Sequence, residues 1–187
     1  MTVTTVSLTL AAASGASAAT VFGFQDAYDP INWTFTNSNA DGSVNTGGAP
    51  ASISLTGGDN GSGFSGTTNY TTTAAAAGTV TFDWDYSTDD PLFDPFGYLL
   101  NGSFIQVTNN GGGLFQNETS TFNVLAGDSF GFRIFTADNT SGRASVTIIS
   151  KFSAPVPEPS TVPEPSTVLS LLVLGGLGAG LKYLKRN

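Results

Sequence analysis

Residues 78–86 alternate apolar and polar side chains with a period of two. In the segment Gly78-Thr-Val-Thr-Phe-Asp-Trp-Asp-Tyr86, every second residue is Val or aromatic, and the residues between them are Thr or Asp. Successive side chains of a β-strand point to opposite faces, so this segment has one dry face and one wet face. The same alternation recurs along the chain, whereas the 3.6-residue period of an amphipathic helix is hard to find before residue 168.

Turn-forming residues separate the alternating segments. The dipeptide Asn101-Gly102 and the residues 109–111, 126–128 and 138–139 combine Asn, Asp and Gly in the manner of β-turns. About nine short strands at this spacing predict an all-β fold, an antiparallel β-sandwich of jelly-roll type. The strands expected besides 78–86 are 31–36, 52–56, 67–73, 97–100, 104–108, 120–125, 129–135 and 144–152.

Two further expectations follow for this domain. Residues 37–66 are rich in Gly and Asn with one short apolar stretch, which predicts a long mobile loop. Large apolar side chains usually fill protein interiors, so those of the last strands are expected in the core: Phe122, Val124, Phe130, Phe132 and Ile134.

The composition excludes several classes of chemistry. The chain has no Cys and no His, so it has no disulfide, no thiolate or imidazole catalysis and none of the usual zinc ligands. Its net charge is −8, and the only cations before the C-terminal segment are Arg133, Arg143 and Lys151. Nucleic acid is therefore not expected as a partner, because binding phosphates needs clusters of basic residues.

Five aspartates lie close together in the sequence: Asp83, Asp85, Asp89, Asp90 and Asp94. Two belong to the wet face of the strand 78–86, and three follow in the next loop. Calcium prefers oxygen ligands of this kind, so calcium is the one metal we consider; no other cofactor is expected. The alternative is a solvated acidic loop without a ligand, since surface charges are screened.

The pair Asp83 and Asp85 also admits an enzymatic interpretation. Alternate residues of a strand lie about 6–7 Å apart, a separation at which two carboxylates can hydrolyse a glycosidic bond. Catalytic pairs, however, normally come from different strands across a cleft. We therefore predict a protein that is not an enzyme.

The C-terminal segment has three parts in a fixed order. The sequence Val-Pro-Glu-Pro-Ser-Thr occurs twice, at 156–161 and 162–167, and an uncharged apolar run from 168 to 181 follows. The chain then ends with the basic residues Lys182, Lys185 and Arg186. The apolar run predicts a transmembrane helix over 168–187, with its basic end in the cytoplasm and the rest of the chain outside.

This arrangement resembles the PEP-CTERM sorting signal of exported proteins in Gram-negative bacteria that make exopolysaccharide. The resemblance implies recognition by an exosortase, a membrane protease or transpeptidase that cuts near the Pro-Glu-Pro motif. The matching residues nearest the membrane are Pro163, Glu164 and Pro165, and the extra copy comprises Pro157, Glu158 and Pro159. The alternative is an ordinary C-terminal anchor with a Pro-rich spacer.

The N-terminus also indicates export. An apolar run of small residues precedes Ala16-Ser17-Ala18, a small-x-small pattern typical of signal-peptide cleavage after Ala18 or Ala19. No basic residue precedes the run, and the alternative is an irregular N-terminal strand. The predicted organisation is a signal peptide at 1–19, a sandwich domain at 20–153, a Pro-rich linker at 154–167 and the membrane segment at 168–187.

Two functions fit these observations. The first is a non-enzymatic surface or matrix protein, anchored in the inner membrane as a precursor, with a structural or adhesive role in exopolysaccharide or biofilm. The alternative is a carbohydrate-binding module, with calcium as a possible requirement. Solvent-exposed aromatic residues on one sheet face would favour the alternative, especially among Tyr28, Trp33, Tyr70 and Tyr98.

Overall fold

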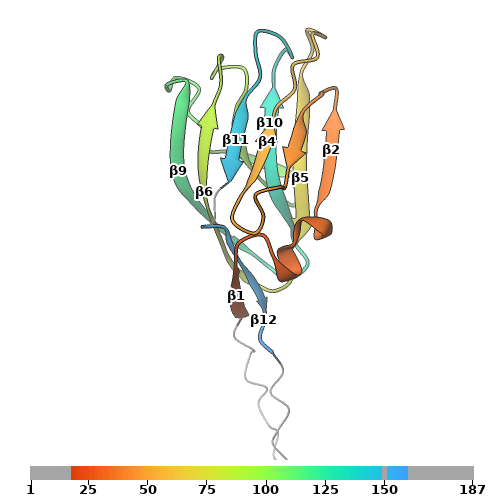
Figure 1. Ribbon diagram of the computed structural model, residues 1–187, viewed down its shortest axis with the longest axis vertical. Helices are drawn as coiled ribbons and strands as arrows, with labels where there is room; N and C mark the ends of the chain where they lie inside the picture. Colours follow the sequence, from red (N-terminus) through yellow and green to blue (C-terminus); the bar gives the residue numbers. More distant parts are fainter. Residues whose placement is uncertain (1–17, 149–150, 160–187) are drawn as a thin grey trace, which may run out of the picture.

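The computed structural model describes residues 18–148 and 151–159, which form two packed antiparallel sheets (Figure 1). The seven-stranded sheet follows the order β1-β12-β6-β11-β4-β3, with β9 on the other edge of β6. Its strands are β1 (Ala18–Phe22), β3 (Ser43–Asn45), β4 (Ile53–Thr56), β6 (Gly78–Ser87), β9 (Phe115–Val124), β11 (Ser145–Ile148) and β12 (Ser153–Pro157).

The five-stranded sheet follows the order β2-β5-β10-β7-β8. Its strands are β2 (Thr34–Ser38), β5 (Gly66–Thr73), β7 (Phe96–Leu100), β8 (Ser103–Gln106) and β10 (Ser129–Thr136). Two short 3-10 helices, η1 (Asp26–Tyr28) and η2 (Pro30–Asn32), precede β2.

The chain winds between the two sheets. From β4 to β7 each strand lies in the opposite sheet from the one before, β8 stays beside β7, and β9, β10 and β11 alternate again. This winding is that of a jelly roll. The antiparallel β-sandwich predicted from the sequence is therefore confirmed, and the alternating segment 78–86 forms β6 at its centre.

The structure corrects three of the local predictions. The expected loop at 37–66 contains an additional strand, β3, which pairs with β4, the strand expected at 52–56. The expected strand at 144–152 is two strands, β11 and β12, which follow one another along the same edge of β6. The expected strand at 31–36 starts as η2, because Pro30 occupies its first turn and the side chain of Asp29 accepts a hydrogen bond from the Ile31 N–H.

The first and last strands of the described chain pair with each other. β1 and β12 run antiparallel, with Ala18 opposite Pro157 and Phe22 opposite Ser153. Both ends of the domain therefore leave it at one end, as Figure 1 shows, and the loops at the tips of β6, β9 and β10 lie at the other. The strands thus extend slightly beyond the predicted domain of 20–153 on both sides.

The predicted terminal segments lie mostly outside the described residues. This applies to residues 1–17 of the predicted signal peptide and to the second Pro-Glu-Pro copy, the apolar run and the basic cluster, all within 160–187. No helix in the described part of the chain is long and apolar enough to cross a membrane.

Aromatic side chains fill the space between the sheets. Trp33, only 7% exposed, stacks between Tyr70 and Phe132 with ring centroids 5.0 Å and 5.5 Å away. Its indole N–H donates to the carbonyl oxygen of Tyr28 at 3.0 Å, and the Tyr28 hydroxyl donates to the carbonyl oxygen of Pro155 at 2.5 Å. The predicted core residues are all buried: Phe122, Val124, Phe130, Phe132 and Ile134.

Candidate functional site

The strands of the five-stranded sheet bury one face and present the other to solvent. On β10, Phe130, Phe132 and Ile134 point into the core, whereas Arg133, between them, is only half-buried. On β5, Tyr70 is buried beside the half-buried Asn69. The period of two therefore places Arg133 and Asn69 on the outer face of this sheet.

One row of residues crosses all five strands on this outer face. Gln106 of β8 lies opposite Gly97 of β7, Gly97 lies opposite Arg133, Arg133 opposite Asn69, and Asn69 opposite Thr36 of β2. We call these five residues the polar row. Gln106 and Thr36 at its two ends are exposed.

Hydrogen bonds and a ring contact hold Arg133 in the middle of the polar row. Its Nε–H donates to Oδ1 of Asn69 at 2.7 Å, and Nδ2 of Asn69 donates to Oγ1 of Thr36 at 3.3 Å. The guanidinium carbon lies 5.7 Å from the ring centroid of Phe104, within reach of a cation–π contact. Partial burial lowers the pKa of Arg133, but a guanidinium stays charged in any case.

Two buried glycines lie beside Arg133. Gly97 is its partner on β7, and Gly131 precedes it by two residues on the same face of β10. A Cβ at Gly97 would collide with the carbonyl oxygen of Ile105, and one at Gly131 with that of Tyr70. Neither position accommodates a side chain, so the guanidinium has no neighbouring side chain at either one.

The outer face combines groups that suit a hydroxyl-rich ligand. Arginine donates hydrogen bonds, the amide of Asn69 both donates and accepts them, and the ring of Phe104 offers an apolar surface. Gln106 can accept through its Oε1, because its Nε2 already donates to the carbonyl oxygen of Thr108 and to Oδ1 of Asn110. Groups of this kind can form hydrogen bonds and apolar contacts with such a ligand.

The aromatic residues singled out from the sequence do not form a binding surface. Tyr28, Trp33 and Tyr70 are buried, and Tyr98 stacks on Phe122 inside the sandwich with ring centroids 4.2 Å apart. The exposed aromatic residues that would favour a carbohydrate-binding module are therefore not found among these four, and that alternative loses this support. The reason is that each lies on the inward-facing side of its strand or plugs the end of the sandwich.

The two strand aspartates lie on the outer face of β6, as predicted. Asp83 forms a 2.8 Å ion pair with Lys151 and accepts a 2.6 Å hydrogen bond from Thr119. These partners lower the pKa of Asp83, Lys151 having the larger effect. Asp83, Asp85 and Glu118 line a hollow of about 150 Å³ on this sheet.

The three loop aspartates take separate positions. Asp89 lies with Phe115 and Arg143 around a second hollow of about 190 Å³. The carbonyl oxygen of Asp90 accepts hydrogen bonds in a tight turn, and Asp94 is 1% exposed. Among the described residues, no three acidic side chains are grouped closely enough to hold a metal. Calcium stays a prediction from the sequence, without a formed site in this structure.

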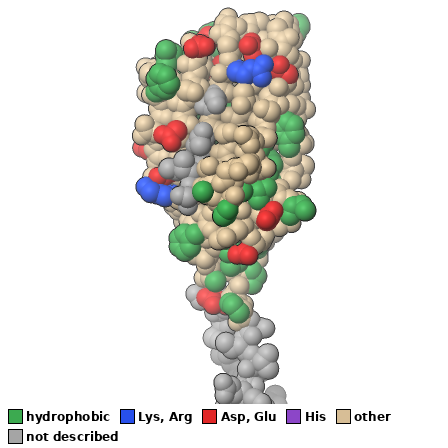
Figure 2. Space-filling view, in the orientation of Figure 1, with side chains coloured by type: hydrophobic (Ala, Val, Ile, Leu, Met, Phe, Trp, Pro, Cys, Tyr) green, Lys and Arg blue, Asp and Glu red, His purple; other side chains and the backbone are tan. Residues whose placement is uncertain are grey.

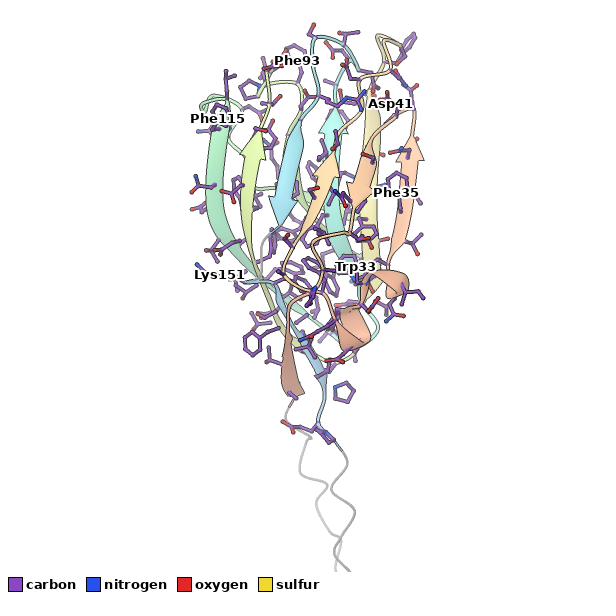
Figure 3. The ribbon with its side chains drawn as sticks, viewed as in Figure 1. Trp33, Phe35, Asp41, Phe93, Phe115 and Lys151 are labelled. Atoms are coloured by element: carbon purple, nitrogen blue, oxygen red, sulfur yellow. The ribbon has the colours of Figure 1, made fainter. Side chains whose placement is uncertain are left out.

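Figure 2 shows how charge is spread over one face of the molecule. Acidic side chains lie along the whole height of the domain, and apolar ones are scattered. The exposed Phe115 and Phe93 lie at the end opposite the chain termini (Figure 3), where Arg143 is paired with Asp41 at 2.9 Å.

The first Pro-Glu-Pro copy begins inside the fold. Pro157 is the last residue of β12, and Val156 before it packs against the core. Glu158 and Pro159 are exposed and belong to no strand. The first copy of the motif is therefore continuous with the sandwich.

No protein-family model matches this sequence, and no curated protein matches it either. Solved structures similar to it include a family 35 carbohydrate-binding module from Clostridium thermocellum, with 13% identity and a TM-score of 0.36 over 71% of this chain and 99% of that one. A structure of carbohydrate-binding modules from the β-sandwich superfamily has 12% identity and a TM-score of 0.44, over 74% of this chain and 62% of that one. TmCBM61 in complex with β-1,4-galactotriose has 10% identity and a TM-score of 0.37, over 73% of this chain and 94% of that one. Similarity at this level does not show what this chain binds.

The buried carboxyl of Asp94 makes a pH effect on stability predictable. Burial raises its pKa to about 6 from 3.8, although hydrogen bonds from Thr136 and Thr88 oppose this. In the unfolded chain the group ionises near its ordinary pKa, so the folded state holds the proton more strongly. Ionisation of Asp94 therefore destabilises the fold increasingly as pH rises from about 4 to about 6, by on the order of 2–3 kcal/mol.

The free energy of unfolding of Asp94→Asn, minus that of the unmodified protein, is expected to rise by this amount when the pH is raised from about 4 to about 7. Urea melts at the two pH values measure it. Asp85→Asn, an exposed position on β6, controls for the loss of one negative charge. An Asp94→Asn difference that is the same at both pH values would contradict the prediction.

Proposed function

We propose that this is an exported, non-enzymatic surface protein whose sandwich binds polysaccharide through the outer face of the five-stranded sheet. The observation that carries the proposal is the polar row, which crosses all five strands in one register. A structural or adhesive role in an extracellular matrix follows from such binding.

The chemistry of the row favours a sugar chain over other extended ligands. Sugars present hydroxyl groups at the edges of their rings and C–H groups on the faces, so they need side-chain hydrogen bonds beside an apolar surface. Asn69, Arg133 and Gln106 supply the first, and Phe104 supplies the second. A peptide that adds a strand would use a sheet edge instead of this face.

Export is supported by the two ends of the sequence. The N-terminal apolar run and the C-terminal apolar run with its basic end both support a domain outside the cytoplasm. Because β1 and β12 leave the domain together, a chain held by its C-terminal segment presents the opposite end away from the membrane (Figure 1). The outer face of the sheet then stays accessible before and after any release.

The resemblance to the PEP-CTERM signal makes an exosortase the proposed processing partner, with the inner membrane holding the precursor. We assign recognition to Pro163, Glu164 and Pro165. Pro157 is paired in β12, so an enzyme that needs a free peptide has poorer access to the first copy.

Replacing Pro163, Glu164 and Pro165 by Ala tests the sorting proposal without disturbing β12. We expect the mature protein to lose its C-terminal mass by processing, and the triple variant to keep its full C-terminus and stay in the membrane fraction. Mass spectrometry of the protein from both strains measures this. An intact C-terminus in the unmodified protein would mean an ordinary anchor.

Affinity electrophoresis in gels that contain soluble polysaccharides tests the binding proposal. We expect at least one polysaccharide to retard the protein and Phe104→Ala to weaken that interaction by about fivefold or more, because it removes the ring beside the row. Phe115→Ala, 81% exposed at the far end, is the matched control. Equal retardation of Phe104→Ala and the unmodified protein would place binding elsewhere.

A further inference from the structure

The five-stranded sheet differs in charge from the rest of the protein. Its strands carry one charged residue, Arg133, and no Asp or Glu, although the whole chain has a net charge of −8. The seven-stranded sheet, by contrast, carries Asp83, Asp85 and Glu118. A single positive group therefore lies in a face without acidic residues.

The other cations of the domain are neutralised within the fold. Arg143 pairs with Asp41 at 2.9 Å, and Lys151 pairs with Asp83 at 2.8 Å. Arg133 takes part in no salt bridge with any residue that the structure describes. A half-buried cation without a counter-ion has lost part of its hydration, so an external anion can stabilise it.

The half-buried guanidinium keeps hydrogen-bond donors for that anion. Only the Nε–H of Arg133 is hydrogen-bonded within the described part of the chain, to Asn69, and this bond fixes the guanidinium plane. The planar group carries further N–H donors on its two Nη atoms, suited to the paired oxygens of a carboxylate or sulfate. The buried Gly97 and Gly131 contribute no side chain that could cover the guanidinium from the neighbouring positions of this face.

We propose that Arg133 binds the carboxylate or sulfate of an acidic sugar residue, so that the ligand of this face is an anionic polysaccharide. The inference rests on the proposed function and specifies its ligand class. A nucleic acid does not fit, because one cation in an acidic protein neutralises too few phosphates.

Four polymers separate the possibilities: polygalacturonate, its methyl ester, dextran sulfate and unmodified dextran. We expect polygalacturonate or dextran sulfate to bind. The uncharged counterpart of the polymer that binds is expected to have an affinity lower by about tenfold or more. Which of the two acidic polymers binds better identifies the anionic group. Affinity electrophoresis at low and high salt gives the comparison.

Variants at Arg133 then test the residue. Arg133→Gln is expected to lose about tenfold or more in affinity for the acidic polymer, whereas Arg133→Lys, which keeps the charge, loses less. Arg143→Gln is the matched control and keeps full affinity, because Arg143 lies outside the polar row and already pairs with Asp41. Thermal melts of all three variants show that the fold is retained.

The outcomes distinguish this inference from the proposed function. Equal binding of the charged and uncharged polymers, weakened by Phe104→Ala, would overturn the inference and leave the proposed function standing. An acidic polymer that binds Arg133→Gln as tightly as the unmodified protein would also overturn the inference. No binding to any of the four polymers or to the wider panel would remove the proposed function and this inference with it.

Discussion

The aromatic cluster around Trp33 is the constraint on which the rest of the structure depends. The chain has no cysteine and therefore no disulfide, so its two sheets are held by packing and hydrogen bonds, with two ion pairs at the surface of the described part. Trp33 stacks on Tyr70 of β5 and Phe132 of β10, and Tyr28 connects this cluster to the segment of β12 through Pro155. The Tyr28 hydroxyl also accepts a hydrogen bond from the Ala75 N–H at 3.1 Å.

The same strands fix both the core and the candidate site. Tyr70 and Phe132 face inward at positions adjacent to Asn69 and Arg133, so packing on one side sets the register of the polar row on the other. A shift by one residue would exchange the two faces and bury the arginine. The position of the binding groups is therefore a consequence of aromatic packing.

The strands and turns that depend on a local pattern of residues could be predicted from the sequence. The strand 78–86 and the turns after Leu100 and Leu125 could be read directly, because alternation and Gly- or Asn-rich turns act over a few residues. The strands β1, β3 and β12 could not, since they are short, and β12 contains Pro155 and Pro157. They exist because each pairs with a partner distant in the sequence or with a neighbour across a turn.

The candidate site could not be predicted from the sequence for a related reason. Its members, Thr36, Asn69, Gly97, Gln106 and Arg133, come from five strands and meet only through the register of the sheet. The one available signal was an isolated arginine in a strand otherwise free of charge. The aspartates illustrate the opposite case. Five carboxylates that are close in sequence do not group as a metal site, because two lie on the face of a strand, Asp94 is buried, and the other two belong to the loop between them.

The central claim is that the outer face of the five-stranded sheet binds the ligand. Nuclear magnetic resonance of the isotope-labelled protein, titrated with oligogalacturonides or with oligosaccharides of whichever polymer binds, tests it most directly. The account predicts that the shifted signals are the Arg133 side-chain Nε–H, the Asn69 side-chain amide and the backbone amides of Gly97 and Gly131. Shifts confined to the far end around Phe115 and Arg143, with the polar row unchanged, would contradict it.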